Sequence, residues 1–254
     1  MAPRIARYGW IRDLPDLRDH LYATPPEFLV KLPSSVDLRS QCPAVYDQGQ
    51  LGSCTANAIA AALEFDQMKE KQSNVFVPSR LFIYYNERVM EGTVNEDSGA
   101  QIRDGIKSVG KQGDCPETLW PYDIKKFAVK PPDKCYQQAL KFKAVQYQRL
   151  SQILNQLKGC LASGYPFVFG FTVYESFESQ QVAQTGHASM PLPKETVVGG
   201  HAVMAVGYDD SQNWFIVRNS WGDGWGLKGY FTLPYAYLLE QNLASDFWTI
   251  RLVS

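Results

Sequence analysis

The sequence has few cysteines and histidines, no long hydrophobic run and no block of like charge. Its 254 residues include five cysteines and three histidines, which is far below the density of a disulfide-stapled scaffold. No stretch approaches the roughly 18 uninterrupted apolar residues that a membrane-spanning helix needs. Lys and Arg total 25 against 26 Asp and Glu, so nothing favours nucleic acid or an anionic membrane as a partner.

The N-terminal stretch also lacks the features of an export signal. It carries early arginines but no apolar core and no small-residue cleavage site, so no secretory signal peptide is predicted. We therefore expect a cytoplasmic protein or one exported by a non-classical route, unless a leader has been removed. No pair of Cys or His has ligand spacing, so we expect no metal and no cofactor.

Hydrophobic periodicity divides the chain into a helical first half and a β-rich second half. Helical patterns cover 54–70, 79–91, 99–110 and 151–162, whereas strand-like runs cover 166–173, 201–208, 214–219, 229–233 and 246–250. This order predicts an α+β fold with two lobes that enclose a cleft. We expect an extension at 1–31 that drapes over the body and could serve as a short inhibitory or chaperoning pro-segment, a helical lobe at 32–145 and a β lobe at 146–254.

Cys54 is the candidate nucleophile because it opens the first helical pattern, directly after Ser53. A helix N-terminus carries partial positive charge and unpaired N–H groups, which favour a thiolate. Cysteines so placed have pKa values of roughly 3.5–7.5. By position alone, a small buried apolar residue is an equally good interpretation of Cys54.

His201 is the candidate base, and Asn219 is its candidate partner. The runs at 201–208 and 214–219 flank a turn and should form an antiparallel hairpin, which places His201 opposite residues 219–221. The Asn219 amide oxygen can then orient the imidazole, leaving its other nitrogen free for Cys54. Without His201 opposite, Asn219 would be a turn or edge residue. His20 and His187 lie in polar, loop-like contexts and are expected at the surface.

Gln48 lies six residues before Cys54 in a glycine-containing loop. Its NH2 group can point to the place where a substrate carbonyl becomes an oxyanion, beside the Cys54 backbone N–H. Taken alone, Gln48 would be a solvated loop side chain.

Together these segments resemble the papain family of cysteine peptidases, from about residue 33 to the C-terminus. The motifs that carry the resemblance are QGQLGSC at 48–54, GHAV at 200–203 and NSWGDGWG at 219–226, and the order Gln, Cys, His, Asn is the family's order. Supporting similarities are VDLR at 36–39 and WPY at 120–122.

The resemblance implies a role for each matching residue. Cys54 would be the nucleophile, His201 the base and acid, Asn219 the orienting residue and Gln48 part of the oxyanion hole. Trp221 would cover the His201–Asn219 contact, although as a lone residue it is equally a core tryptophan. The remaining substrate-binding candidates are Ser98, Gly99 and Gly200, with Gly99 in the segment whose backbone pairs with extended substrate; plain turn chemistry is its rival.

The implied protein is a monomeric, two-lobed enzyme with an antiparallel β-barrel-like second lobe. It would hydrolyse peptide bonds as an endopeptidase, through a thioester acyl-enzyme, and bind peptide or protein substrate in an extended conformation. Two alternatives stay open on the same scaffold. One is an acyl transferase or transamidase, and the other is a non-catalytic binding protein.

The sequence departs from the family in the residues around its nucleophile. Leu51 stands where the family has a cysteine, and the position of that cysteine's partner holds Glu96, so both ends of a disulfide are missing together. Thr55 replaces a common aromatic, so the helix start must pack differently. Cys115 and Cys135 could bridge one another or remain free thiols, and Cys42 and Cys160 lack a recognisable pairing.

Overall fold

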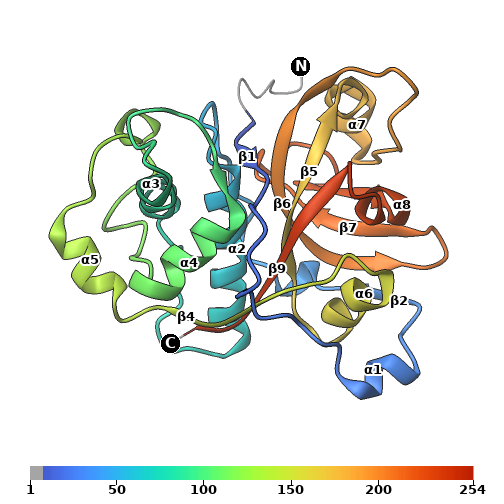
Figure 1. Ribbon diagram of the computed structural model, residues 1–254, viewed down its shortest axis with the longest axis horizontal. Coiled ribbons are helices and arrows are strands. Elements are labelled where there is room, and N and C mark those ends of the chain that lie inside the picture. Colours follow the sequence, from blue (N-terminus) through green and yellow to red (C-terminus); the bar gives the residue numbers. More distant parts are fainter. Residues whose placement is uncertain (1–7, 254) are drawn as a thin grey trace.

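The computed structural model describes residues 8–253, in which helices and a sheet occupy opposite halves (Figure 1). The helical half contains α2 (Cys54–Lys69), α3 (Arg80–Glu91), α4 (Ile102–Gln112) and α5 (Asp133–Ala139). The other half is built on β4 (Ala144–Arg149), β5 (Phe167–Tyr174), β6 (Val197–Asp209), β7 (Trp214–Arg218), β8 (Tyr230–Pro234) and β9 (Ala244–Val253), with α6 (Leu154–Ala162), α7 (Gln180–Thr185) and α8 (Tyr235–Leu239) beside them. The predicted α+β class is confirmed, and each predicted helix and strand has a counterpart.

The sheet is an open, antiparallel one. Its strand order is β4-β9-β5-β6-β7-β8, and β2 (Ser35–Asp37) pairs with β6 from outside this path. Since β4 and β8 do not pair in the part of the chain that the structure describes, the barrel-like lobe expected from the resemblance is not a closed barrel. The strand at 35–37 also joins this sheet from a range that we assigned to the helical lobe.

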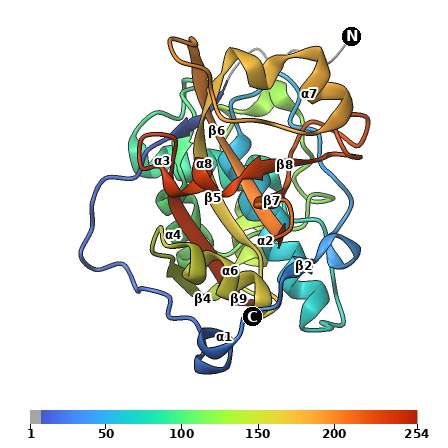
Figure 2. The ribbon, with the colours of Figure 1, turned by 90° about the vertical axis from the view of Figure 1, so that its right-hand side faces the viewer.

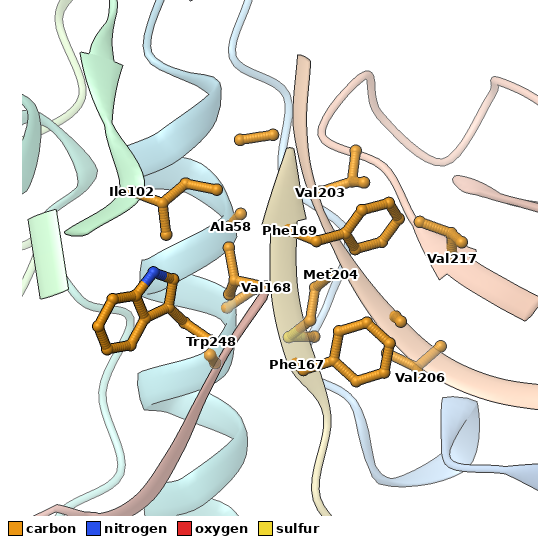
Figure 3. Packing of buried hydrophobic residues seen from close by; sticks show 14 of the residues in the cluster. Ala58, Ile102, Phe167, Val168, Phe169, Val203, Met204, Val206, Val217 and Trp248 are labelled. Atoms are coloured by element: carbon orange, nitrogen blue, oxygen red, sulfur yellow. The ribbon is translucent and has the colours of Figure 1, made fainter. Parts of the chain in front are cut away.

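Helix α2 lies at the centre of the molecule and is buried on nearly every side. One side packs against β5, β6 and β9, and the other packs against α3 and α4. In Figure 3, Ala58 of α2 lies between Ile102 of α4 and Val168 of β5. Small alanines allow this close approach from both directions. The single apolar face predicted for 54–70 is therefore only part of the buried surface.

The described part of the N-terminal segment runs between the two halves. Strand β1 (Trp10–Ile11) pairs in parallel with β3 (Ala100–Gln101) of the helical half. The chain then descends in front of α2 to α1 (Pro26–Val30) before it reaches β2 (Figures 1 and 2). None of the helices among residues 8–253 has the length and apolar character needed to cross a bilayer.

Hydrogen bonds hold the loop before α2 to the 97–99 segment, where the resemblance predicted a missing disulfide. The Asp97 carboxylate accepts from Gly52 N–H at 3.0 Å and from Tyr84 O–H at 2.5 Å, one position beyond Leu51 and Glu96. The Tyr84 hydroxyl in turn accepts from Gly99 N–H at 3.2 Å. A polar network thus takes over the task of a covalent bridge.

Buried Arg88 of α3 supports the same region through hydrogen bonds to backbone carbonyls. Its guanidinium donates to the backbone carbonyls of Val94, Glu96 and Phe127. A planar group with five donors can satisfy several carbonyls at once, which a lysine cannot. Arg88 therefore fixes the loop that carries Asp97.

We predict that Asp97→Ala lowers the free energy of unfolding by about 1–3 kcal/mol, because it leaves a buried tyrosine hydroxyl without its acceptor. Urea denaturation followed by circular dichroism measures the change. The matched control is Glu96→Ala at an exposed side chain, where a change within about 0.5 kcal/mol is expected. Equal effects of the two substitutions would contradict the assigned role of Asp97.

Candidate active site

Cys54 is the first residue of α2 and faces strand β6 of the other half. Its thiol is fully buried, and the backbone N–H groups of Gly9, Thr55 and Ala202 lie in hydrogen-bonding contact with it. Ser53 occupies the N-cap position but does not cap the helix through its side chain, which instead contacts the Tyr122 hydroxyl at 2.5 Å. The helix start thus leaves its donors for the thiol and for whatever binds beside it.

His201 lies on β6, immediately before the Ala202 N–H that reaches the thiol. Its Nε2 donates to the Asn219 side-chain oxygen at 2.8 Å, and this oxygen also accepts from Ser220 N–H at 2.9 Å. The other imidazole nitrogen, Nδ1, is buried and has no hydrogen-bond partner. The imidazole is therefore oriented through one nitrogen, and the other remains available for proton transfer.

The hairpin predicted around His201 is present, with a register shift. The β6–β7 ladder runs from Asp209/Trp214 to Met204/Arg218, with a bulge between Ala205 and Gly207. His201 and Asn219 lie just beyond the last pair and meet diagonally instead of directly opposite one another. Trp221 stacks on the imidazole with ring centroids 5.0 Å apart and planes inclined by 30°, so its indole shields the His201–Asn219 contact.

Gln48 is buried beside these residues and is held from two directions. Its side-chain oxygen accepts from the Ser220 hydroxyl at 2.6 Å, and its Nε2 donates to Leu51 O at 2.9 Å. One N–H of the amide therefore remains for a ligand. The sequence reasoning did not single out this contact of Ser220 with Gln48, although Ser220 lies next to Asn219.

Thr55 shows how the helix start packs without the aromatic residue of the resembling family. Its hydroxyl donates to the Glu87 carboxyl of α3 at 2.6 Å, and both side chains are buried. Burial raises the pKa of Glu87 well above its usual value, which favours the neutral carboxyl. A polar contact between two helices thus replaces an aromatic one.

The pKa values of the candidate nucleophile and the candidate base are both shifted toward the neutral form in this structure. Burial raises the pKa of the Cys54 thiol to about 12, despite the three N–H groups that favour the thiolate. Burial likewise lowers the pKa of His201 to about 4, against the effect of Asn219. The low thiol pKa expected from the helix N-terminus is therefore wrong for this state, because desolvation outweighs the helix end.

Residues 8–13, which we call the strap, contribute to this burial. Gly9 crosses directly over the loop before Cys54, so that a Cβ on Gly9 would lie 1.7 Å from Gly52 O. The Tyr8 ring packs edge-on against His201, with centroids 5.8 Å apart, and its hydroxyl donates to Glu178 at 2.6 Å. The strap thus covers both halves of the site. The sequence predicted an extension over the body, but it did not indicate which residues of that extension reach the site.

The strap contacts three of the four predicted substrate-binding residues. Ala100 N–H donates to Gly9 O at 2.7 Å, and a Cβ on Gly99 would lie 2.1 Å from the same oxygen. Gly200 approaches the backbone and ring of Trp10, and Trp221 lies 6.2 Å from Tyr8 between ring centroids. Ser98 instead turns its hydroxyl to Thr93, at 3.0 Å.

The remaining cysteines and histidines lie away from this arrangement. All five cysteines are free thiols, with Cys115 and Cys135 buried and in contact through their sulfurs. His20 and His187 are exposed, as expected, and His187 stacks on Trp214. Within residues 8–253 no cluster of three or more Cys, His, Asp or Glu side chains is suited to hold a metal ion.

Comparison with known proteins assigns the family. The family model for papain family cysteine proteases matches residues 32–245. The chain belongs to the papain family of cysteine proteases. Membership makes it a hydrolase with peptide or protein substrates, as the resemblance implied.

Two relatives of this papain-family chain match over nearly its whole length. The crystal structure of xylellain, a cysteine protease from Xylella fastidiosa, is 48% identical with a TM-score of 0.90, and the match covers 97% of this chain and 96% of that one. A peptidase C1-like protein of Acanthamoeba polyphaga mimivirus is 47% identical over 97% of this chain and 87% of its own. Mouse cathepsin K is 29% identical over 85% of this chain and 63% of its own.

We predict that Gly9→Ala raises the rate at which iodoacetamide alkylates Cys54 by about tenfold or more, because the added Cβ cannot fit against Gly52 O and the strap lifts. Peptide mapping by mass spectrometry measures the rate at Cys54. Gly224→Ala is the matched control, since a Cβ there meets nothing within 4 Å and the labelling rate should not change. Equal rates in wild type and Gly9→Ala would show that the strap does not limit access.

Proposed function

We propose that this papain-family protein is an endopeptidase that acts through a thioester acyl-enzyme and that the strap holds it in a latent state. The observation that carries the proposal is the orientation of His201. Its Nε2 is committed to Asn219, whereas its buried Nδ1 has no partner, beside the strand residue that contacts the Cys54 thiol.

The proposed reaction starts when the strap leaves. Water then reaches Cys54 and His201, the desolvation penalty on both charged forms falls, and the thiol proton passes to Nδ1. The thiolate attacks a peptide carbonyl, and the oxyanion accepts hydrogen bonds from the Cys54 N–H and the remaining Gln48 N–H. The imidazolium protonates the leaving amine, and the neutral imidazole then activates water to hydrolyse the thioester.

The domain limits follow from the same proposal. Residues 8–13 would act as the inhibitory part of a short pro-segment at 1–31, of which residues 1–7 lie outside the described residues. The lobes at 32–145 and 146–254 would carry the nucleophile and the His–Asn pair respectively. The contact of Gly9 with the thiol and of Tyr8 with the imidazole supports this division.

In a Gly9→Ala background, we expect substitutions of the proposed catalytic residues to lower peptide cleavage to different extents. Cys54→Ala should abolish cleavage of a fluorogenic peptide, and Gln48→Ala should lower kcat by roughly 10²–10³, as removal of one oxyanion donor does. Exposed Gln41 provides the matched control, and Gln41→Ala should leave kcat unchanged. A Cys54→Ala variant that still cleaves peptides would refute the nucleophile.

The latent state should respond weakly to pH because two buried groups oppose each other. The pKa of His201 falls from 6.5 to about 4, so its contribution to strap closure is present above pH 6.5 and is lost as pH falls toward 4. The pKa of Asp13 rises to about 6, mainly through burial and next through Asp246, so its contribution is present below pH 3.8 and is lost as pH rises through 6. As the pH falls from 6.5 to 4, the closed strap loses the contribution of His201 and gains that of Asp13, so the two changes offset each other.

Asp13→Asn should remove this balance. The equilibrium constant for opening of the strap should then rise by up to roughly a hundredfold as the pH falls from 6.5 to 4. Hydrogen exchange at the Ala100 amide, which donates to Gly9 O, reports the opening after correction for intrinsic exchange. Asp16→Asn is the matched control on the same segment, at a carboxylate that pairs with Arg18 and Lys107. Equal pH profiles in Asp13→Asn and wild type would contradict the balance.

A further inference from the structure

Tyr122 ends the WPY segment at 120–122, a motif of the family resemblance to which the proposed reaction gives no task. Its hydroxyl donates to the backbone carbonyl of Gln48 at 2.9 Å and lies 2.5 Å from the Ser53 hydroxyl. A phenol has one proton to donate, so Ser53 is the donor in the second contact. A single hydroxyl thus joins the two segments that carry the proposed oxyanion donors.

The two proposed oxyanion donors are held by different halves of the molecule. The Cys54 N–H belongs to the first turn of α2, directly after Ser53. Gln48 is attached to the segment after β7, because its N–H donates to Ser220 O at 2.9 Å and its side-chain oxygen accepts from the Ser220 hydroxyl at 2.6 Å. An oxyanion must lie about 2.7–3.1 Å from both donors, so the relative position of the two segments decides how well it is stabilised.

Arg80 of α3 fixes the ring of Tyr122. The guanidinium carbon lies 4.0 Å from the centroid of that ring, and Glu117 holds the guanidinium through two hydrogen bonds of 2.7 and 2.8 Å. The same guanidinium donates to the carbonyl of Asp47, the residue before Gln48, at 3.1 Å. Since Arg80 is buried, its stacking on the ring and its bond to the loop are both protected from water.

Asn57 of α2 fixes the Ser53 hydroxyl that donates to Tyr122. Its amide group donates to the Ser53 hydroxyl at 3.1 Å and to the Ser53 carbonyl at 2.9 Å, and its side-chain oxygen accepts from Arg80 at 3.2 Å. The Ser53 hydroxyl therefore has both a donor and an acceptor partner, which accounts for its failure to cap α2. The hydrogen bond to Tyr122 thus comes from a side chain that is itself held in place.

We propose that Tyr122 is a positioning residue for the oxyanion hole, whose hydroxyl sets the distance between the Gln48 side chain and the Cys54 N–H. This rests on the proposed peptidase function and adds a residue that acts through these two donors. Without the hydroxyl, the Gln48 loop follows Ser220 on one side and loses one of its ties to α2 on the other. The two donors then no longer converge on one oxygen, and a displacement of about 1 Å is enough to slow an enzyme.

The test adds Tyr122→Phe to the full chain in the Gly9→Ala background, which removes one oxygen and keeps the ring on Arg80. With a fluorogenic peptide amide, kcat should fall by about tenfold while KM stays within about twofold, because the oxyanion forms only in the transition state. The rate at which iodoacetamide alkylates Cys54 should also stay within about twofold, since displacement of iodide builds no charge on a carbonyl oxygen. A general disturbance of the site would change both rates.

A double-mutant cycle tests whether Tyr122 acts through Gln48. In a Gln48→Ala protein the side-chain donor is already absent, so Tyr122→Phe should lower kcat by less than about threefold and the two losses should not multiply. The matched control is Tyr136→Phe, which also removes a phenol hydroxyl from the helical half, one that donates to Asn86 at 3.1 Å. This control should leave kcat unchanged.

The positioning role and the peptidase function fail in different ways. The role of Tyr122 is refuted, and the peptidase function stands, if Tyr122→Phe leaves kcat unchanged or lowers kcat and the alkylation rate together. A tenfold loss that persists in Gln48→Ala refutes it as well. If the Gly9→Ala protein cleaves no peptide although Cys54 is alkylated readily, the peptidase proposal has failed and the role of Tyr122 falls with it.

Discussion

The site depends on the contact between the N-terminal end of α2 and strand β6. Cys54 belongs to one half of the molecule and His201 to the other, so their approach is set by how a fully buried helix packs on the sheet. Small alanines along α2 bring the helix close enough for Ala202 N–H to reach the thiol. Packing that is fixed on both sides of α2 leaves Cys54, the candidate nucleophile, little freedom to shift.

Covering this contact changes its chemistry as well as its access. A thiolate–imidazolium pair needs solvation or hydrogen bonds for both charges, and the strap removes the water while leaving His201 Nδ1 without a partner. The neutral thiol and neutral imidazole are the forms that low dielectric favours. The proposed latency therefore does not require the strap to distort any residue of the candidate site, since the side chains of His201 and Gln48 are already oriented by hydrogen bonds beneath it.

Local sequence patterns were sufficient for the elements and for the motif residues. The strand-like runs, the turn before 214 and the helix at 54 are local features, and they placed His201 near Asn219 within a small register error. Contacts that join distant segments were not predictable in this way. Three contacts link parts of the chain that no periodicity relates. Gly9 packs on Gly52, the Asp97 carboxylate accepts from Gly52 N–H before α2, and the Ser220 hydroxyl donates to Gln48. The predicted low pKa of the Cys54 thiol was wrong for the same reason, because the strap, a distant segment, contributes to the burial of the thiol.

The glycines that contact the strap fit the proposal that a peptide substrate takes the place of the strap. Gly99, Gly170 and Gly200 come from three separate elements or loops, and a Cβ on any of them would collide with the strap. Glycine within a strand costs conformational entropy and packing, so Gly170 and Gly200 weaken β5 and β6 locally. A face shaped for one internal segment would gain little from that cost once the segment leaves. Under the proposed function the benefit is kept, because an extended peptide that replaces the strap needs the same close backbone approach at these glycines.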